Sequence, residues 1–334
     1  MKRNKSSAWL NNLIIIIINT MKHVILPFDI KAVLVIGIEY VLEYIYSIIC
    51  SKHKIKESTT EIIRNSETTQ NSEITRNIPR KSAVLLDGTS KYGSILCDKL
   101  INQGYSVIYP DETSTHKEYT VPIPIKIRNE DSIDIFIKKV SQKSIDLLVI
   151  NSSECKLSKD IRIRPIKGIE KKIIPSKEKK GFINKNELYK DKSRILLEKD
   201  YNAKKNYLFN FLLIRGFSDK LKSGNGMVII CTHRIFNLVK KPPVFIPSYL
   251  FSYCYSQLLS YFLGIGAKSR YNYLDVRIIS CSFMNELWTD YVIHSINKTK
   301  KRTVQYFNGL SEEHINSEYF DSANDVWENA EMIS

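Results

Sequence analysis

The sequence predicts an α/β protein built on a doubly wound parallel sheet. Short continuous apolar runs, typical of strands that are buried on both faces, recur between residues 83 and 307. Segments with helical periodicity separate these runs, so strands and helices alternate as a parallel sheet requires. With 334 residues and 43% hydrophobic content the chain can bury a full core, and one domain with appendages is the natural division.

The first βαβ unit carries a dinucleotide-binding pattern over about 30 residues. In order, it holds an apolar strand from Ala83 to Leu86, the turn Asp87-Gly88-Thr89-Ser90, a helix from Gly93 to Gly104, and a strand from Ser106 to Tyr109. A helix that opens after a glycine turn presents free N–H groups to a pyrophosphate. Asp111, about 20 positions beyond Gly88, is placed to accept hydrogen bonds from a ribose.

This pattern predicts a Rossmann-like site for NAD(P), formed by Gly88, Thr89, Ser90, Gly93 and Asp111. The glycine motif is incomplete, because Lys91 and Tyr92 stand where close backbone approach favours small residues. We therefore expect weakened cofactor binding, and a plain strand-to-helix turn is the alternative interpretation.

Later segments continue the alternation of strands and helices. Strands are predicted at 145–150, 226–233, 276–280 and 303–307, and helices at 132–141, 201–221 and 253–263. The segments with chemical interest are Ile150-Asn151-Ser152-Ser153 after the first of these strands, Asn206 in a helix, Thr232-His233 at a strand end, and Tyr253-Cys254-Tyr255-Ser256-Gln257.

In their order and spacing, these segments make residues 81–310 resemble a short-chain dehydrogenase/reductase, and in particular a divergent fungal family of unknown function within that superfamily. The resemblance implies that Asn151 belongs to the cofactor site. It also implies that Asn206, Thr232 and Tyr253 occupy catalytic positions, with His233 as the alternative to Thr232, and that Gln257 stands where the family has a lysine.

A glutamine at position 257 departs from the family's chemistry. In that chemistry a tyrosine acts as general acid or base, and the lysine lowers its pKa and holds the ribose. A neutral amide supplies no positive charge to Tyr253, which we then expect to be a poor base near neutral pH. The alternative is a structural role, in which Tyr253 and Tyr255 are core aromatics and Asn151 and Asn206 cap turns or helices.

The amino-terminal segment, residues 1–56, has the pattern of a targeting or membrane-associated region. Basic residues and the apolar run from Leu13 to Ile18 precede Asp29, the first acidic residue. A second apolar stretch from Ala32 to Cys50 carries Glu39 and Glu43 one helical turn apart, which favours an interfacial or re-entrant helix over a simple span. The alternative is a core helix of the globular part.

The remaining regions are polar or charged. Residues 57–80 are predicted to be a polar linker, 156–194 a basic insertion within the domain, and 311–334 a loosely packed acidic tail. The six cysteines are scattered without metal-ligand spacing, so we expect no metal site and buried reduced thiols. The formal charge of +15 partly reflects a composition rich in Ile, Lys and Asn, which makes a nucleic-acid partner a minor alternative.

Three functions compete on this sequence. The favoured one is a membrane-associated, non-catalytic module that acts by binding, with a protein as one candidate partner. The second is an enzyme, an NAD(P)-dependent reductase of a lipid-like carbonyl substrate. The third is a binder of anionic lipid or nucleic acid through the basic insertion. We expect an intracellular, membrane-associated location, with the mitochondrion favoured and the endoplasmic reticulum as the alternative.

Overall fold

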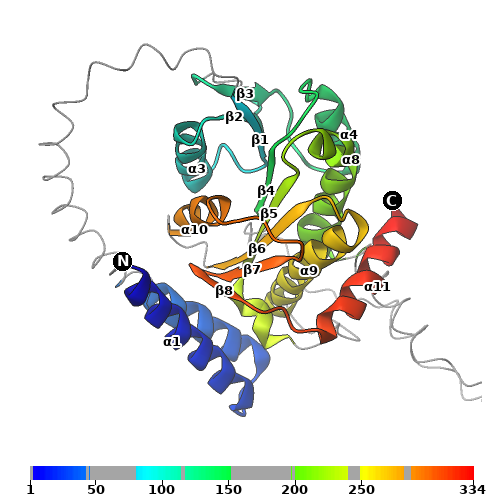
Figure 1. The fold of residues 1–334 in the computed structure, drawn as a ribbon. Coiled ribbons are helices and arrows are strands. Elements are labelled where there is room, and N and C mark those ends of the chain that lie inside the picture. The colour runs from blue at the N-terminus through cyan, green and yellow to red at the C-terminus, as the bar shows by residue number, and fades with distance from the viewer. Residues whose placement is uncertain are drawn as a thin grey trace, which may run out of the picture.

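The computed structural model describes residues 3–42, 45, 80–113, 117–151, 197, 200–239, 249–281 and 287–334. Their strands form one eight-stranded sheet in the order β3-β2-β1-β4-β5-β6-β7-β8 (Figure 1). The strands are β1 (Lys81–Leu85), β2 (Tyr105–Pro110), β3 (Thr120–Ile123), β4 (Leu147–Asn151), β5 (Met227–His233), β6 (Asp275–Cys281), β7 (Gln305–Asn308) and β8 (Ser311–Glu313). All neighbouring pairs are parallel except β7 with β8.

Helices cover both faces of this sheet. On one face lie α3 (Lys91–Asn102) and α10 (Leu287–Ile296), and on the other α4 (Glu130–Lys139), α8 (Phe209–Ser223) and α9 (Tyr249–Arg270), with α11 (Glu318–Ile333) packed outside α9 (Figure 1). The strand order reverses between β1 and β4, as it does in Rossmann-type sheets, where ligands bind beyond the carboxyl ends of the strands at this point. The predicted Rossmann-like fold is confirmed.

Local sequence explains where two of the helices begin. Ser90 caps α3 by accepting a hydrogen bond from the Gly93 N–H, and Asn129 caps α4 in a capping box with Ser132. The short strands β3 and β8 were not predicted, because β3 contains Pro122 and β8 is three residues long with two glutamates. Cys97, Cys231, Cys254 and Cys281 are buried thiols, as predicted.

The acidic C-terminal segment is not loosely packed, and the expectation drawn from its charge was wrong. Its helix α11 places its carboxylates largely outward and buries Ala323, Val326, Trp327 and Ala330. The Trp327 ring lies 4.8 Å from the ring of Phe211 in an edge-to-face arrangement. A count of charges misses this helix, because its apolar residues are few but recur on one face.

The N-terminal residues form two helices that pack against the domain. Helix α1 (Arg3–His23) and a second helix over residues 28–42 pair through Ile14, Ile18 and Val35, and Ala32 joins the main core. The outer surface of this helical hairpin exposes Ile16, Ile25, Val33 and other apolar side chains, and Ile25 at its tip is 100% exposed. Within the described part of the chain, no helix combines the length and the hydropathy that a bilayer crossing requires.

Several sequence predictions lie outside the described residues. These are the basic insertion 156–194, the polar linker except for Arg80 at its end, and the two serines that follow Asn151.

Candidate functional site

The turn after β1 occupies the position at which a dinucleotide's pyrophosphate would bind. Ser90 Oγ accepts the Gly93 N–H at 2.9 Å and donates to Asp87 Oδ2 at 2.8 Å. Asn151, at the end of β4, donates from Nδ2 to the same Asp87 oxygen at 3.3 Å. The structure therefore brings Ser90 and Asn151 together, but around a carboxylate that would repel an incoming phosphate.

Both glycines of this turn are required by packing. A Cβ on Gly88 would lie 2.5 Å from the Tyr109 ring, and a Cβ on Gly93 would lie 1.5 Å from the Asp87 carbonyl oxygen. These contacts explain the glycines without a ligand, and Thr89 is exposed at the tip of the turn.

Asp111, the predicted ribose partner, lies apart from that cluster at the end of β2. It is buried, and its Oδ1 accepts the Thr113 N–H at 2.9 Å and the Thr113 hydroxyl at 2.8 Å. Asp111 thus closes its own turn, and binding a ribose there would have to compete with this local pair.

The residues in the catalytic positions meet at the carboxyl end of β5. Thr232 Oγ1 donates to the Gln257 carbonyl at 2.8 Å, and Gln257 Oε1 accepts the His233 N–H at 2.8 Å. The rings of His233 and Tyr253 lie 6.1 Å apart, edge to face. Thr232, Tyr253 and Gln257 are therefore brought together as the resemblance implied, while the side chain of Gln257 is used to tie α9 to β5.

Asn206 lies in a π-helical turn, Lys204–Leu208, between α7 (Tyr201–Ala203) and α8. Its Nδ2 donates to Ser256 Oγ at 2.9 Å, and its carbonyl accepts Asn210 Nδ2 at 2.8 Å and Ser260 Oγ at 3.1 Å. Such turns are frequent at functional sites. Here the widened turn is satisfied by buried side chains of α9, so Asn206 acts as a link between two helices.

A buried ion pair lies beside this group and was not predicted as part of it. Arg234, the first residue of the 3-10 helix η3 (Arg234–Leu238), places Nη1 3.3 Å from Oε1 of Glu39 on the second N-terminal helix. His233 Nε2 lies 3.7 Å from the other Glu39 oxygen. Glu39 and Arg234 are each 1% exposed, so the N-terminal hairpin is attached beyond the carboxyl end of β5, on the side of the sheet where ligands bind in folds of this type.

The environment of Glu39 favours its neutral form. Burial raises the pKa of Glu39 above its ordinary value of 4.5, and the nearby Arg234 guanidinium opposes this by lowering it. The sequence signal for this contact was present in part, since a glutamate within an apolar stretch needs a partner when it is buried. The partner, Arg234, is too distant in sequence for periodicity to identify.

The fold has many structural relatives, although no protein-family model matches the sequence and no curated protein is similar to it in sequence. A short chain dehydrogenase from Burkholderia cenocepacia J2315, solved in complex with NADP, is 16% identical, with a TM-score of 0.44, over 76% of this chain and 95% of that chain. An oxidoreductase of the short chain dehydrogenase/reductase family from Brucella ovis, with partially ordered NAD, is 14% identical, with a TM-score of 0.44, over 69% of this chain and 100% of that chain. A carbonyl reductase from Pseudomonas aeruginosa PAO1 is 10% identical, with a TM-score of 0.43, over 68% of this chain and 95% of that chain. At such identities these are likenesses of fold alone, and the Rossmann-like assignment rests on the strand order described above.

Proposed function

We propose that this protein is a membrane-associated, non-catalytic module with a short-chain-dehydrogenase-like fold that acts by binding. The observation that carries the proposal is the position of Gln257. Its side chain is fully buried, and its Oε1 accepts hydrogen bonds from Thr232 Oγ1 at 3.2 Å and the His233 N–H at 2.8 Å. An amide used in this way does not bring the positive charge that the family's lysine supplies.

The cofactor side of the site supports the same proposal. The carboxylate of Asp87 lies in the turn where a pyrophosphate would need donors, and Ser90 already caps the N-terminus of α3. Asp111 is engaged by Thr113. A dinucleotide would have to displace these contacts and tolerate a like charge, so we expect NAD(P) affinity to be low.

Membrane association is supported by the outer face of the N-terminal hairpin. Among the residues that the structure describes, eleven of the 16 exposed large hydrophobic side chains lie on residues 16–45: Ile16, Val24, Ile25, Leu26, Ile30, Val33, Leu34, Ile38, Tyr40, Val41 and Ile45. Grouped apolar residues of this kind mark interaction surfaces in soluble proteins. The preceding sequence is basic, with Lys2, Arg3 and Lys5, which favours an anionic bilayer surface over a protein partner.

A reductase remains the second candidate, favoured by Tyr253 on α9, which lies one helical turn before the Gln257 whose carbonyl accepts from Thr232 Oγ1. The ring of His233, next to Thr232 in sequence, lies 6.1 Å from that of Tyr253. A lipid-like carbonyl substrate would suit an enzyme attached to a bilayer.

The third candidate, binding of anionic lipid or nucleic acid through the basic insertion, concerns residues outside the described part of the chain.

Cofactor binding and turnover decide between the first two candidates. We expect no rise in the melting temperature of the full chain with NADH or NADPH, because a ligand that binds only the native state must stabilise it. We also expect no oxidation of either cofactor with ketones and 3-ketoacyl compounds. Turnover that disappears in Tyr253→Phe would establish the reductase and refute the proposal.

Flotation with liposomes tests the membrane part. Ile25→Asp with Val33→Asp should abolish flotation on anionic vesicles, because each change places a charge where an apolar side chain worth about 1.5 to 3 kcal/mol of burial would insert. Ile135→Asp is the matched control, since Ile135 is exposed on α4, away from the hairpin. Equal flotation of the two variants would contradict the proposed surface.

A further inference from the structure

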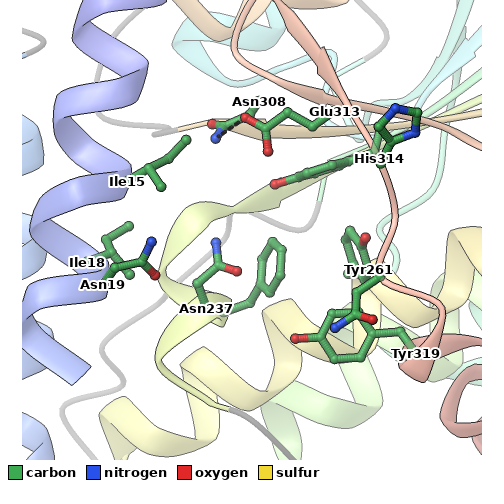
Figure 2. Close-up of a pocket in the computed structure, with 12 residues that line it drawn as sticks. Ile15, Ile18, Asn19, Asn237, Tyr261, Asn308, Glu313, His314 and Tyr319 are labelled. Atoms are coloured by element: carbon green, nitrogen blue, oxygen red, sulfur yellow. Dashed lines mark hydrogen bonds between the residues drawn. The ribbon is translucent and has the colours of Figure 1, made fainter. Parts of the chain in front are cut away.

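A cavity of about 220 Å³ lies between the N-terminal helix α1, the 3-10 helix η3 and the β7–β8 hairpin. Figure 2 shows Ile15 and Asn19 approaching it from α1, Asn237 from η3, and Glu313 from β8. No residue of the predicted cofactor or catalytic positions lines it. Drug-sized ligands occupy pockets of roughly 300 to 1,000 Å³, so this cavity suits a smaller group.

One wall of the cavity is aromatic. Phe236, Tyr261, Tyr306 and Tyr319 all line it, and Tyr261 is the centre of the cluster. The Tyr261 ring centroid lies 4.8 Å from that of Phe236, 5.2 Å from that of Tyr306 and 5.7 Å from that of Tyr319. The four rings come from η3, α9, β7 and α11, so the tertiary fold assembles them.

An acidic group lies beside the aromatic wall, because Glu313 on β8 pairs with Tyr306 on β7. Glu313 is half-buried, and its Oε1 accepts a hydrogen bond from Asn308 Nδ2 at 3.0 Å. The lining contains no lysine or arginine, and among the described residues no ion pair to Glu313 is formed. Arg234 lies near Tyr306 but is paired with Glu39. The carboxylate is therefore the charge that this cavity presents to a ligand.

The tyrosines add no charge of their own. Burial raises the pKa of Tyr261 and of Tyr306 far above the usual value, so both phenols stay neutral at physiological pH. Neutral rings with an electron-rich face attract cations, most strongly when water is excluded. Apart from His314, the lining offers an anion no group that can carry a positive charge, so the cavity disfavours phosphates and nucleotides.

We propose that this cavity binds a small organic cation, an ammonium group with alkyl substituents such as trimethylammonium. The aromatic wall offers cation–π contacts to the alkylated nitrogen, Glu313 offers the counter-charge, and the amides of Asn19 and Asn237 offer hydrogen bonds to a polar substituent. This site goes beyond the proposed function and does not depend on whether the β5 end is catalytic.

The same cation chemistry has two sources, a free ligand and a lipid headgroup. The cavity borders α1, whose Lys22 Nζ donates to Asn19 Oδ1 at 3.0 Å at the cavity's rim. In a zwitterionic headgroup, the ammonium would enter the cavity while a phosphate remained near Lys22. The experiment therefore includes both forms of the ligand.

The test is thermal unfolding of the full chain with choline chloride, at constant ionic strength, against the uncharged isostere 3,3-dimethyl-1-butanol. We expect a saturable rise in melting temperature with choline and none with the isostere. Glu313→Gln should weaken the response at least tenfold, since glutamine keeps the hydrogen bond from Asn308 but removes the charge. Glu318→Gln, on an exposed side chain that does not line the cavity, should respond as the natural protein does.

Vesicles of phosphatidylcholine and of phosphatidylglycerol distinguish the sources. Protection from unfolding by phosphatidylcholine that is lost in Glu313→Gln identifies a lipid headgroup, whereas a response to free choline alone identifies a soluble ligand, and either result supports the cation site. If Glu313→Gln does not fold, Tyr319→Leu takes its place, because it removes one ring of the wall.

Equal stabilisation by choline and its isostere, or an unchanged choline response in the variant, would overturn the proposal. Neither result bears on NADH or NADPH turnover, which tests the proposed function separately.

Discussion

Replacing Glu39 by leucine should release the N-terminal hairpin from the domain. The change leaves the guanidinium of Arg234, 1% exposed, without either acceptor oxygen of Glu39, the nearer of which lies 3.3 Å from Nη1. Removing one partner of a buried pair costs roughly 3 to 5 kcal/mol, because the other charge remains desolvated.

Detachment of the hairpin limits how much the substitution lowers the free energy of global unfolding. The hairpin can lift away and let water reach Arg234, so the free energy of local opening absorbs most of the effect. Hydrogen exchange over residues 28–42 should therefore accelerate about a hundredfold or more, whereas the strands of the sheet should exchange nearly as before. Glu118→Gln, on an exposed side chain, is the control.

Two results would refute this reasoning. Unchanged protection of residues 28–42 in Glu39→Leu would show that the pair does not hold the hairpin. The double replacement Glu39→Leu with Arg234→Met should restore protection, because an apolar pair of similar volume often matches or exceeds a buried ion pair. If it were as unprotected as the single variant, the loss would not come from an orphaned charge.

The same pair should make hairpin docking depend on pH. Burial raises the pKa of Glu39 above 4.5 in the native state, so the docked form holds a proton to higher pH than the undocked form does. Its stabilising effect is thus fully present below about pH 4.5 and is lost as pH rises through the native pKa. Exchange rates corrected for intrinsic pH effects should show this decline in the natural protein and not in Glu39→Gln, apart from any contribution of His233.

Three further substitutions test the site and the packing. Gln257→Lys should not create NADH or NADPH oxidation, and turnover by this variant would show that the cofactor turn is intact. The change should lower the free energy of unfolding by about 1 to 3 kcal/mol, because lysine cannot accept a hydrogen bond from the His233 N–H. Trp327→Ala should lower the free energy of unfolding, measured in urea, by about 3 to 5 kcal/mol. A change below about 0.5 kcal/mol would show that α11 is not packed on the domain. Gly93→Ala should reduce the melting temperature, since its Cβ would meet the Asp87 carbonyl at 1.5 Å, and an unchanged value would show that the turn adjusts freely.

The sequence predicted the strands that are buried on both faces, because such strands are continuous apolar runs. The resemblance assigned Thr232, Tyr253 and Gln257 to one site, and the structure places Thr232 at the end of β5 against α9, which carries the other two. What these residues do could not be predicted in the same way. The use of Gln257 Oε1 by the His233 N–H depends on a distance across two elements, which no periodicity encodes.

The contacts of the N-terminal hairpin mark the other limit of sequence reasoning. Apolar runs alone do not distinguish a helix that faces lipid from one that packs on the domain, and here the same helix has both an exposed apolar face and the buried residues Ala32 and Glu39. The pairing of Glu39 with Arg234 and the cavity beside Glu313 both arise from segments far apart in the chain.

The two edges of the sheet restrict how copies of this protein can associate. At one edge, β3 contains Pro122, which has no N–H to offer another strand. At the other edge, β8 is three residues long and carries Glu312 and Glu313 in succession. Short, charged or proline-containing edges discourage strand-to-strand joining. Neither edge of the described sheet therefore favours pairing with a strand of another copy, whether or not the N-terminal hairpin is docked.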